Sequence, residues 1–196
     1  MLRTAVFAVF PLVLVIPAQS ALTMVGSGNI AVTVDPSGSY SVTVPDLVWS
    51  FSGSIGVPLN NLQPGTSADA LGGYSEISFD FQSDVARHAS IRSYMEHPEV
   101  LFTVSYPSSG AANTFAFPNF TQYPRNFGHL TFSGTFAPPS FWAFASDSPW
   151  IFFDSSGKSF ILSPAANFMT ASTAWCAYLR LLYKALRLNS CLRKIS

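Results

Sequence analysis

Two acidic residues near the middle of the chain could perform acid–base chemistry. Glu76 and Asp80 lie four residues apart in the alternating run YSEISFDFQS (74–83), so a strand places both on one face. Glycosidases hold two carboxylates across the bond that they cleave, and a small glycosidase using this pair is therefore one hypothesis. Acidic residues on the solvent side of a half-buried strand are the more common explanation of the same pattern.

A second polar cluster, RSYMEHPEV (92–100), contains an arginine, a histidine and two glutamates. These residue types serve as metal ligands and acid–base groups, but Glu96–Glu99 is typical of a solvated turn between two strands. The three histidines are far apart and match no metal-ligand spacing. They are His88, His97 and His129. No nucleophile elbow, phosphate-binding loop or dinucleotide fingerprint occurs. The sequence therefore predicts no catalytic residue, no metal and no cofactor.

The stretch PSSGAANTFAFPNFTQYPRN (107–126) places aromatic side chains among proline and asparagine and is predicted to be a long loop. Long ordered loops often carry function, and aromatic rings stack on ligand rings. The candidate ligand contacts are Phe115, Phe117, Phe120, Tyr123 and Arg125. Alternatively, these aromatic side chains close the open end of a sandwich. Asn119-Phe120-Thr121 is also a glycosylation sequon, which makes Asn119 a candidate acceptor.

The elements that would position these residues are short strands. NIAVTVDPSGSYSVTV (29–44) and SPWIFFDSSGKSFILSP (148–164) are typical of hairpins with tight turns at 35–38 and 154–157. Further strands are expected at 46–55, 74–83, 89–95, 100–106 and 129–136, and loops at 56–73 and 107–126. Because no helical period occurs between 21 and 168, residues 21–169 are predicted to form an all-β antiparallel sandwich.

The first twenty residues, MLRTAVFAVFPLVLVIPAQS, have the pattern of a secretory signal peptide. Arg3 precedes an apolar run at 5–16, and Ala18 and Ser20 are small residues suited to a cleavage site after position 20. The apolar run is shorter than the about 20 residues that a membrane anchor needs. The expected location is extracellular.

The charges are unevenly distributed along the chain. Residues 21–170 contain four basic residues against all ten acidic ones, a formal charge of −6, whereas residues 171–196 contain five basic residues and no acidic one. A mildly acidic body gives no reason to expect nucleic acid as a partner. Residues 170–196 are predicted to form a basic amphipathic helix, with three cations on one side. They are Arg180, Lys184 and Arg187.

Three explanations of this C-terminal segment are open. It could dock on the acidic body, lie through residues 172–196 on an anionic membrane surface, or come from a shifted reading frame or retained intron rather than native sequence. It cannot easily span a bilayer, because charged residues recur within it.

The segment SPWIFFDSSGKSFILSPAANFM (148–169) resembles a stretch in the N-terminal β-domain of large secreted proteins of the α-galactosidase clan, the family 36 glycoside hydrolases and their relatives. The resemblance covers roughly residues 25–169 and implies an N-terminal β-sandwich, with the catalytic carboxylates in a following (β/α)₈ barrel. A barrel needs about 250 residues. Only 27 residues follow Met169, so no catalytic residue of that family can be placed on this sequence.

The sequence thus predicts an exported, non-catalytic β-sandwich module, a truncated N-terminal domain of a glycoside hydrolase-like protein. Its partner would be a carbohydrate polymer or the missing catalytic domain. A membrane- or cell-surface-associated protein that acts through its basic C-terminal helix is the second hypothesis, and the small glycosidase with Glu76 and Asp80 is the third.

Overall fold

The structure is a computed structural model that describes residues 20–105, 115–124, 127–131, 149–163 and 165. Within these residues the chain forms twelve strands and two single-turn 3₁₀ helices, η1 (Ser27–Asn29) and η2 (Pro45–Leu47), and contains no longer helix. The prediction of a mostly β, antiparallel chain is therefore confirmed. None of the helices in this part of the chain is long or apolar enough to cross a bilayer.

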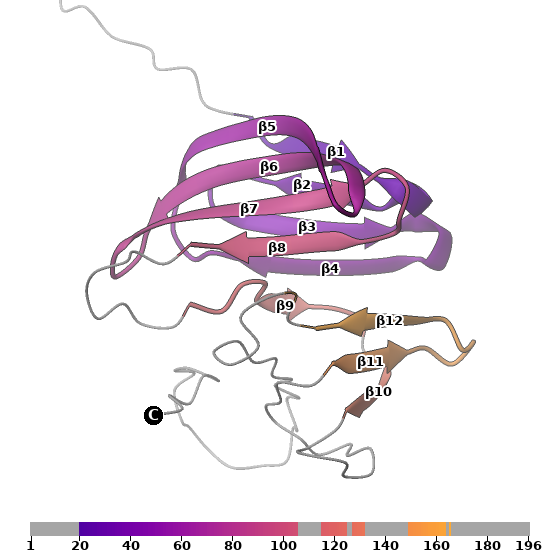
Figure 1. Cartoon of the computed structure of the whole chain (residues 1–196). Helices are drawn as coiled ribbons and strands as arrows, with labels where there is room; N and C mark the ends of the chain where they lie inside the picture. The colour runs from indigo at the N-terminus through magenta and orange to yellow at the C-terminus, as the bar shows by residue number, and fades with distance from the viewer. Residues whose placement is uncertain (1–19, 106–114, 125–126, 132–148, 164, 166–196) are drawn as a thin grey trace, which may run out of the picture.

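The strands form three antiparallel sheets (Figure 1). The first sheet has the order β1 (Leu22–Val25), β2 (Ala31–Val34), β3 (Ser39–Val44), β4 (Trp49–Ser54) and β9 (Phe120–Gln122). The second sheet is a simple meander of β5 (Leu59–Asp69), β6 (Gly72–Gln82), β7 (Ala86–Tyr94) and β8 (Val100–Val104). The third sheet contains β10 (Gly128–Thr131), β11 (Trp150–Phe153) and β12 (Ser159–Leu162).

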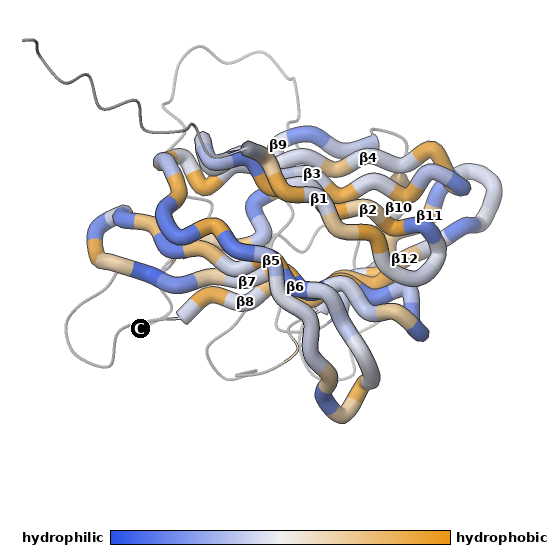
Figure 2. The backbone as a smooth tube through the Cα atoms, turned by 90° about the horizontal axis from the view of Figure 1, so that it is seen from above, coloured by the Kyte–Doolittle hydropathy of each residue, from blue (hydrophilic) through white to orange (hydrophobic). Residues whose placement is uncertain are grey.

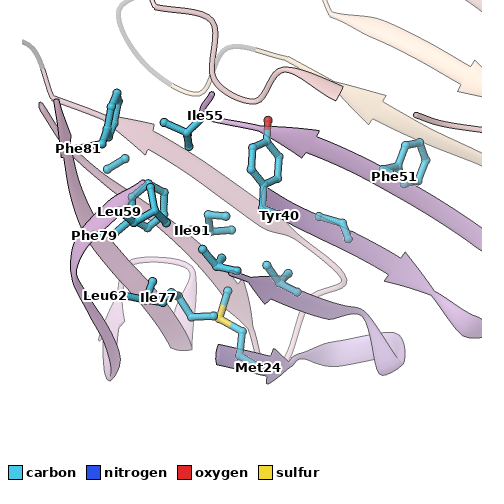
Figure 3. Close-up of a cluster of buried hydrophobic side chains, with 14 of the residues drawn as sticks. Met24, Tyr40, Phe51, Ile55, Leu59, Leu62, Ile77, Phe79, Phe81 and Ile91 are labelled. Carbon is cyan, nitrogen blue, oxygen red and sulfur yellow. The ribbon is translucent and has the colours of Figure 1, made fainter. Parts of the chain in front are cut away.

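The first and second sheets lie as two layers in both views of the backbone (Figures 1 and 2). Most of their strands alternate apolar and polar residues, and the apolar side chains of both sheets form one buried cluster. Figure 3 shows Tyr40 of the first sheet and Ile77, Phe79 and Ile91 of the second within one cluster between the two sheets, and Phe51 farther along the first sheet. Burying alternate residues from two facing sheets leaves the remaining side chains of each strand on the outer, polar faces.

Both predicted hairpins are confirmed. In the β2–β3 turn the Asp35 carboxylate accepts a hydrogen bond from the Ser37 backbone N–H at 2.8 Å, and Gly38 takes a positive φ of 94°. In the β11–β12 turn the Asp154 carboxylate accepts the Ser156 backbone N–H at 2.8 Å in the same way. These turns form because a short acidic side chain satisfies the turn amides and glycine tolerates the left-handed backbone.

The predicted loop at 56–73 is wrong, because β5 occupies most of it. Only Leu59 and Leu62 of this strand are buried, so its sequence lacks the alternation of a half-buried strand. It also contains Pro64, which an edge strand tolerates because one side of its backbone is not paired. The strand exists through its pairing with β6, with an irregularity in register between Asn60 and Gln63.

Other predicted element boundaries lie closer to the observed ones. The strand predicted from residue 46 begins at Trp49, after the single turn η2 and a left-handed Val48. The predicted loop at 107–126 contains the three-residue strand β9. The strand predicted at 129–136 corresponds to β10, whose range ends at 131, and positions 132–136 lie outside the described residues. Residues 1–19 of the predicted signal peptide at 1–20, and the predicted helix from residue 170 onward, also lie outside them.

Candidate functional site

The pair proposed for acid–base chemistry, Glu76 and Asp80, lies on the outer face of the second sheet. Glu76 accepts a hydrogen bond from Arg92 Nε at 2.6 Å. Asp80 accepts one from Asn61 Nδ2 at 2.7 Å and shares another with His88 Nδ1 at 2.8 Å. The partners on β7 are the residues directly opposite on the neighbouring strand. Each carboxylate is thus engaged by its own cross-strand neighbours rather than by the other carboxylate.

The spacing of this pair does not suit glycoside hydrolysis. Four residues of extended strand span about 13 Å, whereas retaining and inverting glycosidases hold their carboxyl groups about 5–10 Å apart. Hydrogen bonds from Asn61 and His88 also lower the pKa of the Asp80 carboxyl. A general acid needs the opposite, a raised pKa that keeps its proton near neutral pH.

Arg92 is the centre of an ion-pair network on the same face. Besides Glu76, its guanidinium reaches Asp69 at 3.5 Å and lies 4.5 Å from the centre of the Tyr74 ring. The hydroxyl of the buried Tyr94 donates to the Asp69 carboxylate at 2.8 Å. Burial raises the pKa of this hydroxyl, and its bond to Asp69 raises it further. The network joins β5, β6 and β7 and gives each of its charged groups a partner within the sheet, which is a structural arrangement.

The rest of the second polar cluster lies apart from this network. Glu96–Glu99 form the exposed turn between β7 and β8, as the sequence predicts. Within the described ranges no three potential metal-ligating side chains come together.

The aromatic segment predicted to contact a ligand lies along the side of the two-sheet core. The Phe117 ring is 5.6 Å from Tyr40 on β3 and 5.4 Å from Phe102 on β8. The Phe120 ring is 5.6 Å from Phe51 on β4 and 5.8 Å from Phe102. Phe117 therefore links β3 to β8 and Phe120 links β4 to β8, and both rings cover apolar side chains that would otherwise face water.

The other aromatic candidates are also half-buried. Phe115 lies 4.9 Å from Phe81 and 5.7 Å from the guanidinium of the buried Arg87, measured to the ring centre. Tyr123 packs against the same core. These contacts favour the interpretation that the aromatics close the sandwich, and contact with a ligand stays a prediction. Four candidates lie outside the described residues: Arg125, Arg180, Lys184 and Arg187.

Sequence reasoning missed a shallow hollow of about 360 Å³ on the outer face of the first sheet, which we call the hydroxyl hollow. Thr33, Ser41, Ser52 and Gln122 stand opposite one another across β2, β3, β4 and β9. Its remaining lining consists of Asp35, Ser39, Tyr40, Gly53, Ser54 and Thr121. The signal was present in the alternation of serine and threonine with apolar residues, but only the strand order brings these side chains together.

The candidate acceptor Asn119 lies beside this hollow. Its side chain is exposed, and its backbone N–H donates to the Tyr40 hydroxyl at 2.5 Å. Thr121, the third residue of the sequon, is exposed too, and its hydroxyl donates to the Ser52 carbonyl at 3.4 Å. The register shifts between Ser52 and Gly53, so Thr121 is the extra residue of a bulge in β9.

Comparison of the chain with protein-family models, with curated proteins and with solved structures finds no match. The resemblance to the family 36 glycoside hydrolases therefore stays a prediction.

Proposed function

We propose that this chain is a non-catalytic β-sandwich module of an exported, glycoside hydrolase-like protein, and that its partner is a carbohydrate polymer or a catalytic domain. In this proposal the first and second sheets are the two layers of the sandwich, and residues 170–196 form a basic amphipathic helix. The common core of the two sheets supports the sandwich, and the spacing of cations supports the helix.

The observation that carries the proposal is the state of the two carboxylates on β6. Glu76 is paired with Arg92, and Asp80 is held by Asn61 and His88 with a lowered pKa. Their separation along an extended strand, about 13 Å, exceeds what a glycosidase uses. A chain with acids arranged in this way is suited to a structural or accessory role, and the resemblance in 148–169 suggests carbohydrate as the context.

Turnover of a panel of aryl glycosides tests the proposal that the chain is non-catalytic. We expect the full chain to release no aryl alcohol above the rate of a heat-unfolded sample. Glu76→Gln and Asp80→Asn serve as matched variants, because each keeps the shape of the side chain and removes its acid. Turnover by the native chain that disappears in either variant would overturn the proposal.

The partner is tested by affinity electrophoresis in gels that contain a soluble polysaccharide. Retardation of the full chain by a neutral glucan or galactomannan is expected if its partner is a carbohydrate polymer. Unchanged mobility in all of these gels would leave the catalytic domain as the partner in this proposal. Mixing the chain with a separately expressed barrel domain of a family 36 enzyme would then test the catalytic domain as partner. Absence of a complex would refute it.

A further inference from the structure

We propose that Asn119 carries an N-linked glycan and that the first sugars of this glycan lie in the hydroxyl hollow. This covalent modification goes beyond the accessory role proposed above, and its sugars would lie on the outer face of the first sheet.

The strand β9 presents the sequon at the surface. Asn119 and Thr121 are exposed on either side of Phe120, whose ring packs against Phe51 and Phe102 and anchors the segment. The acceptor backbone is held by the Tyr40 hydroxyl. The side-chain amide of Asn119 can therefore carry a large substituent without disturbing the core.

The covalent step is a group transfer from a lipid-linked oligosaccharide diphosphate in the secretory pathway. The Nδ2 atom of Asn119 forms a bond to the anomeric carbon of the first N-acetylglucosamine. The bond between that carbon and the diphosphate oxygen breaks, and the lipid diphosphate leaves with the electron pair. The amide nitrogen loses one proton, and nothing is oxidised or reduced.

The hollow has the chemistry to receive sugar residues. Its walls carry serine and threonine hydroxyls and the amide of Gln122, which donate and accept hydrogen bonds as sugar hydroxyls and acetamido groups do. Among its lining residues Asp35 is the one charged at neutral pH, and its carboxylate is already bound within the β2–β3 turn. A neutral, polyhydroxylated occupant therefore matches the surface better than a charged or an apolar one.

The distance between acceptor and hollow is short. Thr121 and Gln122 line the hollow, and they follow the acceptor by two and three residues. The rise of a strand separates them from Asn119 by about 7–10 Å, which the asparagine side chain and one or two sugar rings can bridge. The hollow of about 360 Å³ is shallow, so it would support the first sugar rings from one side without enclosing them.

A glycan at this place would also protect an edge. Within the described residues β9 pairs with β4 alone and forms one edge of the first sheet. Exposed edge strands offer unpaired backbone groups to other chains, and proteins often cover them. A sugar chain lying along this edge would sterically prevent such pairing.

Occupancy is tested with the full chain behind a cleavable host leader in a eukaryotic secretory host, so that entry does not depend on its own first twenty residues. We expect a mass increase that peptide N-glycosidase removes. Thr121→Ser keeps the sequon and should keep the modification, whereas Thr121→Ala and Asn119→Gln should abolish it. Secreted native chain without the mass increase would overturn the proposal, and circular dichroism of each variant checks that it has folded.

Placement is tested by trimming the glycan to its first sugar and comparing melting temperatures. We expect trimming to lower the melting temperature of the native chain by about 2–4 °C, the shift of one net hydrogen bond at this chain length. In the double variant Ser41→Val/Ser52→Val, which removes two hydroxyls of the hollow, trimming should lower the melting temperature by less than half as much. Ser78→Val, on the outer face of the second sheet, should behave like the native chain. If trimming lowers the melting temperature of the native chain and of both variants equally, or does not lower that of the native chain, the sugars do not lie in the hollow.

Discussion

The hydroxyl of Tyr40 is a sensitive test of how the aromatic segment closes the core. The side chain is 3% exposed, and its hydroxyl accepts the Asn119 backbone N–H at 2.5 Å. Burial raises its pKa to about 12, although the bond from Asn119 partly opposes the shift. Replacing Tyr40 by phenylalanine removes the hydroxyl and this titration together, and leaves the ring contacts in place.

Two opposing effects determine how much Tyr40→Phe changes the free energy of unfolding. At pH 7, Tyr40→Phe should lower the free energy of unfolding by about 1 kcal/mol, the net value of one hydrogen bond. Because the folded-state pKa lies above the unfolded value, the neutral form stabilises the fold fully below about pH 10 and this stability is lost as pH rises toward 12. At pH 11 the native chain should have lost about 1.4 kcal/mol that the variant keeps.

The stability difference between the two proteins should therefore reverse between about pH 10.5 and 11. Urea unfolding followed by tryptophan fluorescence at pH 7, 9, 10.5 and 11 measures this. Comparing the two proteins at each pH cancels the titration of all other tyrosines. A difference that stays constant from pH 7 to 11 would refute the burial of this hydroxyl between β3 and β9.

Four further substitutions test the packing around this region, each by urea unfolding. Gly53→Ala should lower the free energy of unfolding by about 1–3 kcal/mol, because the new methyl group would overlap the buried Tyr40 ring and the backbone oxygen of Asn119; an unchanged value would contradict this close approach. Phe117→Ala should cost about 2 kcal/mol, since the ring is half-buried, whereas a side chain that serves only a ligand would cost almost nothing. Ser93→Ala should be neutral or stabilising, because the buried Ser93 hydroxyl has no hydrogen-bond partner within the described part of the chain; a clear loss would reveal one. Arg92→Met should cost about 1 kcal/mol, and the cost should shrink in 1 M salt if the pairing with Glu76 supplies it.

The elements that the sequence predicted correctly are those with local causes. The turns at 35–38 and 154–157 form from residues within four positions of one another, so their side-chain and backbone preferences are visible in the sequence. The alternation in 74–83 likewise predicts that Ile77, Phe79 and Phe81 of β6 are buried, and all three are.

The strand β5 had no such local signal. Nine of its eleven residues are exposed, and its proline and glycine are typical of loops. It is a strand because β6 offers an edge to pair with, and that partner lies beyond a turn that the sequence of 59–69 does not describe. The sequence of β6 could not show which side chains pair with Glu76 and Asp80 for the same reason, since those partners come from β5 and β7.

The sequence by itself determined that the body is antiparallel β, where its hairpins turn and which face of β6 is polar. These properties depend on side-chain alternation and on residues adjacent in the chain. Only the tertiary structure decided that Phe117 and Phe120 pack between the first sheet and β8, and that serines and threonines of four strands line one hollow beside Asn119. Those arrangements depend on strand order and register, which are set by contacts between residues distant in sequence.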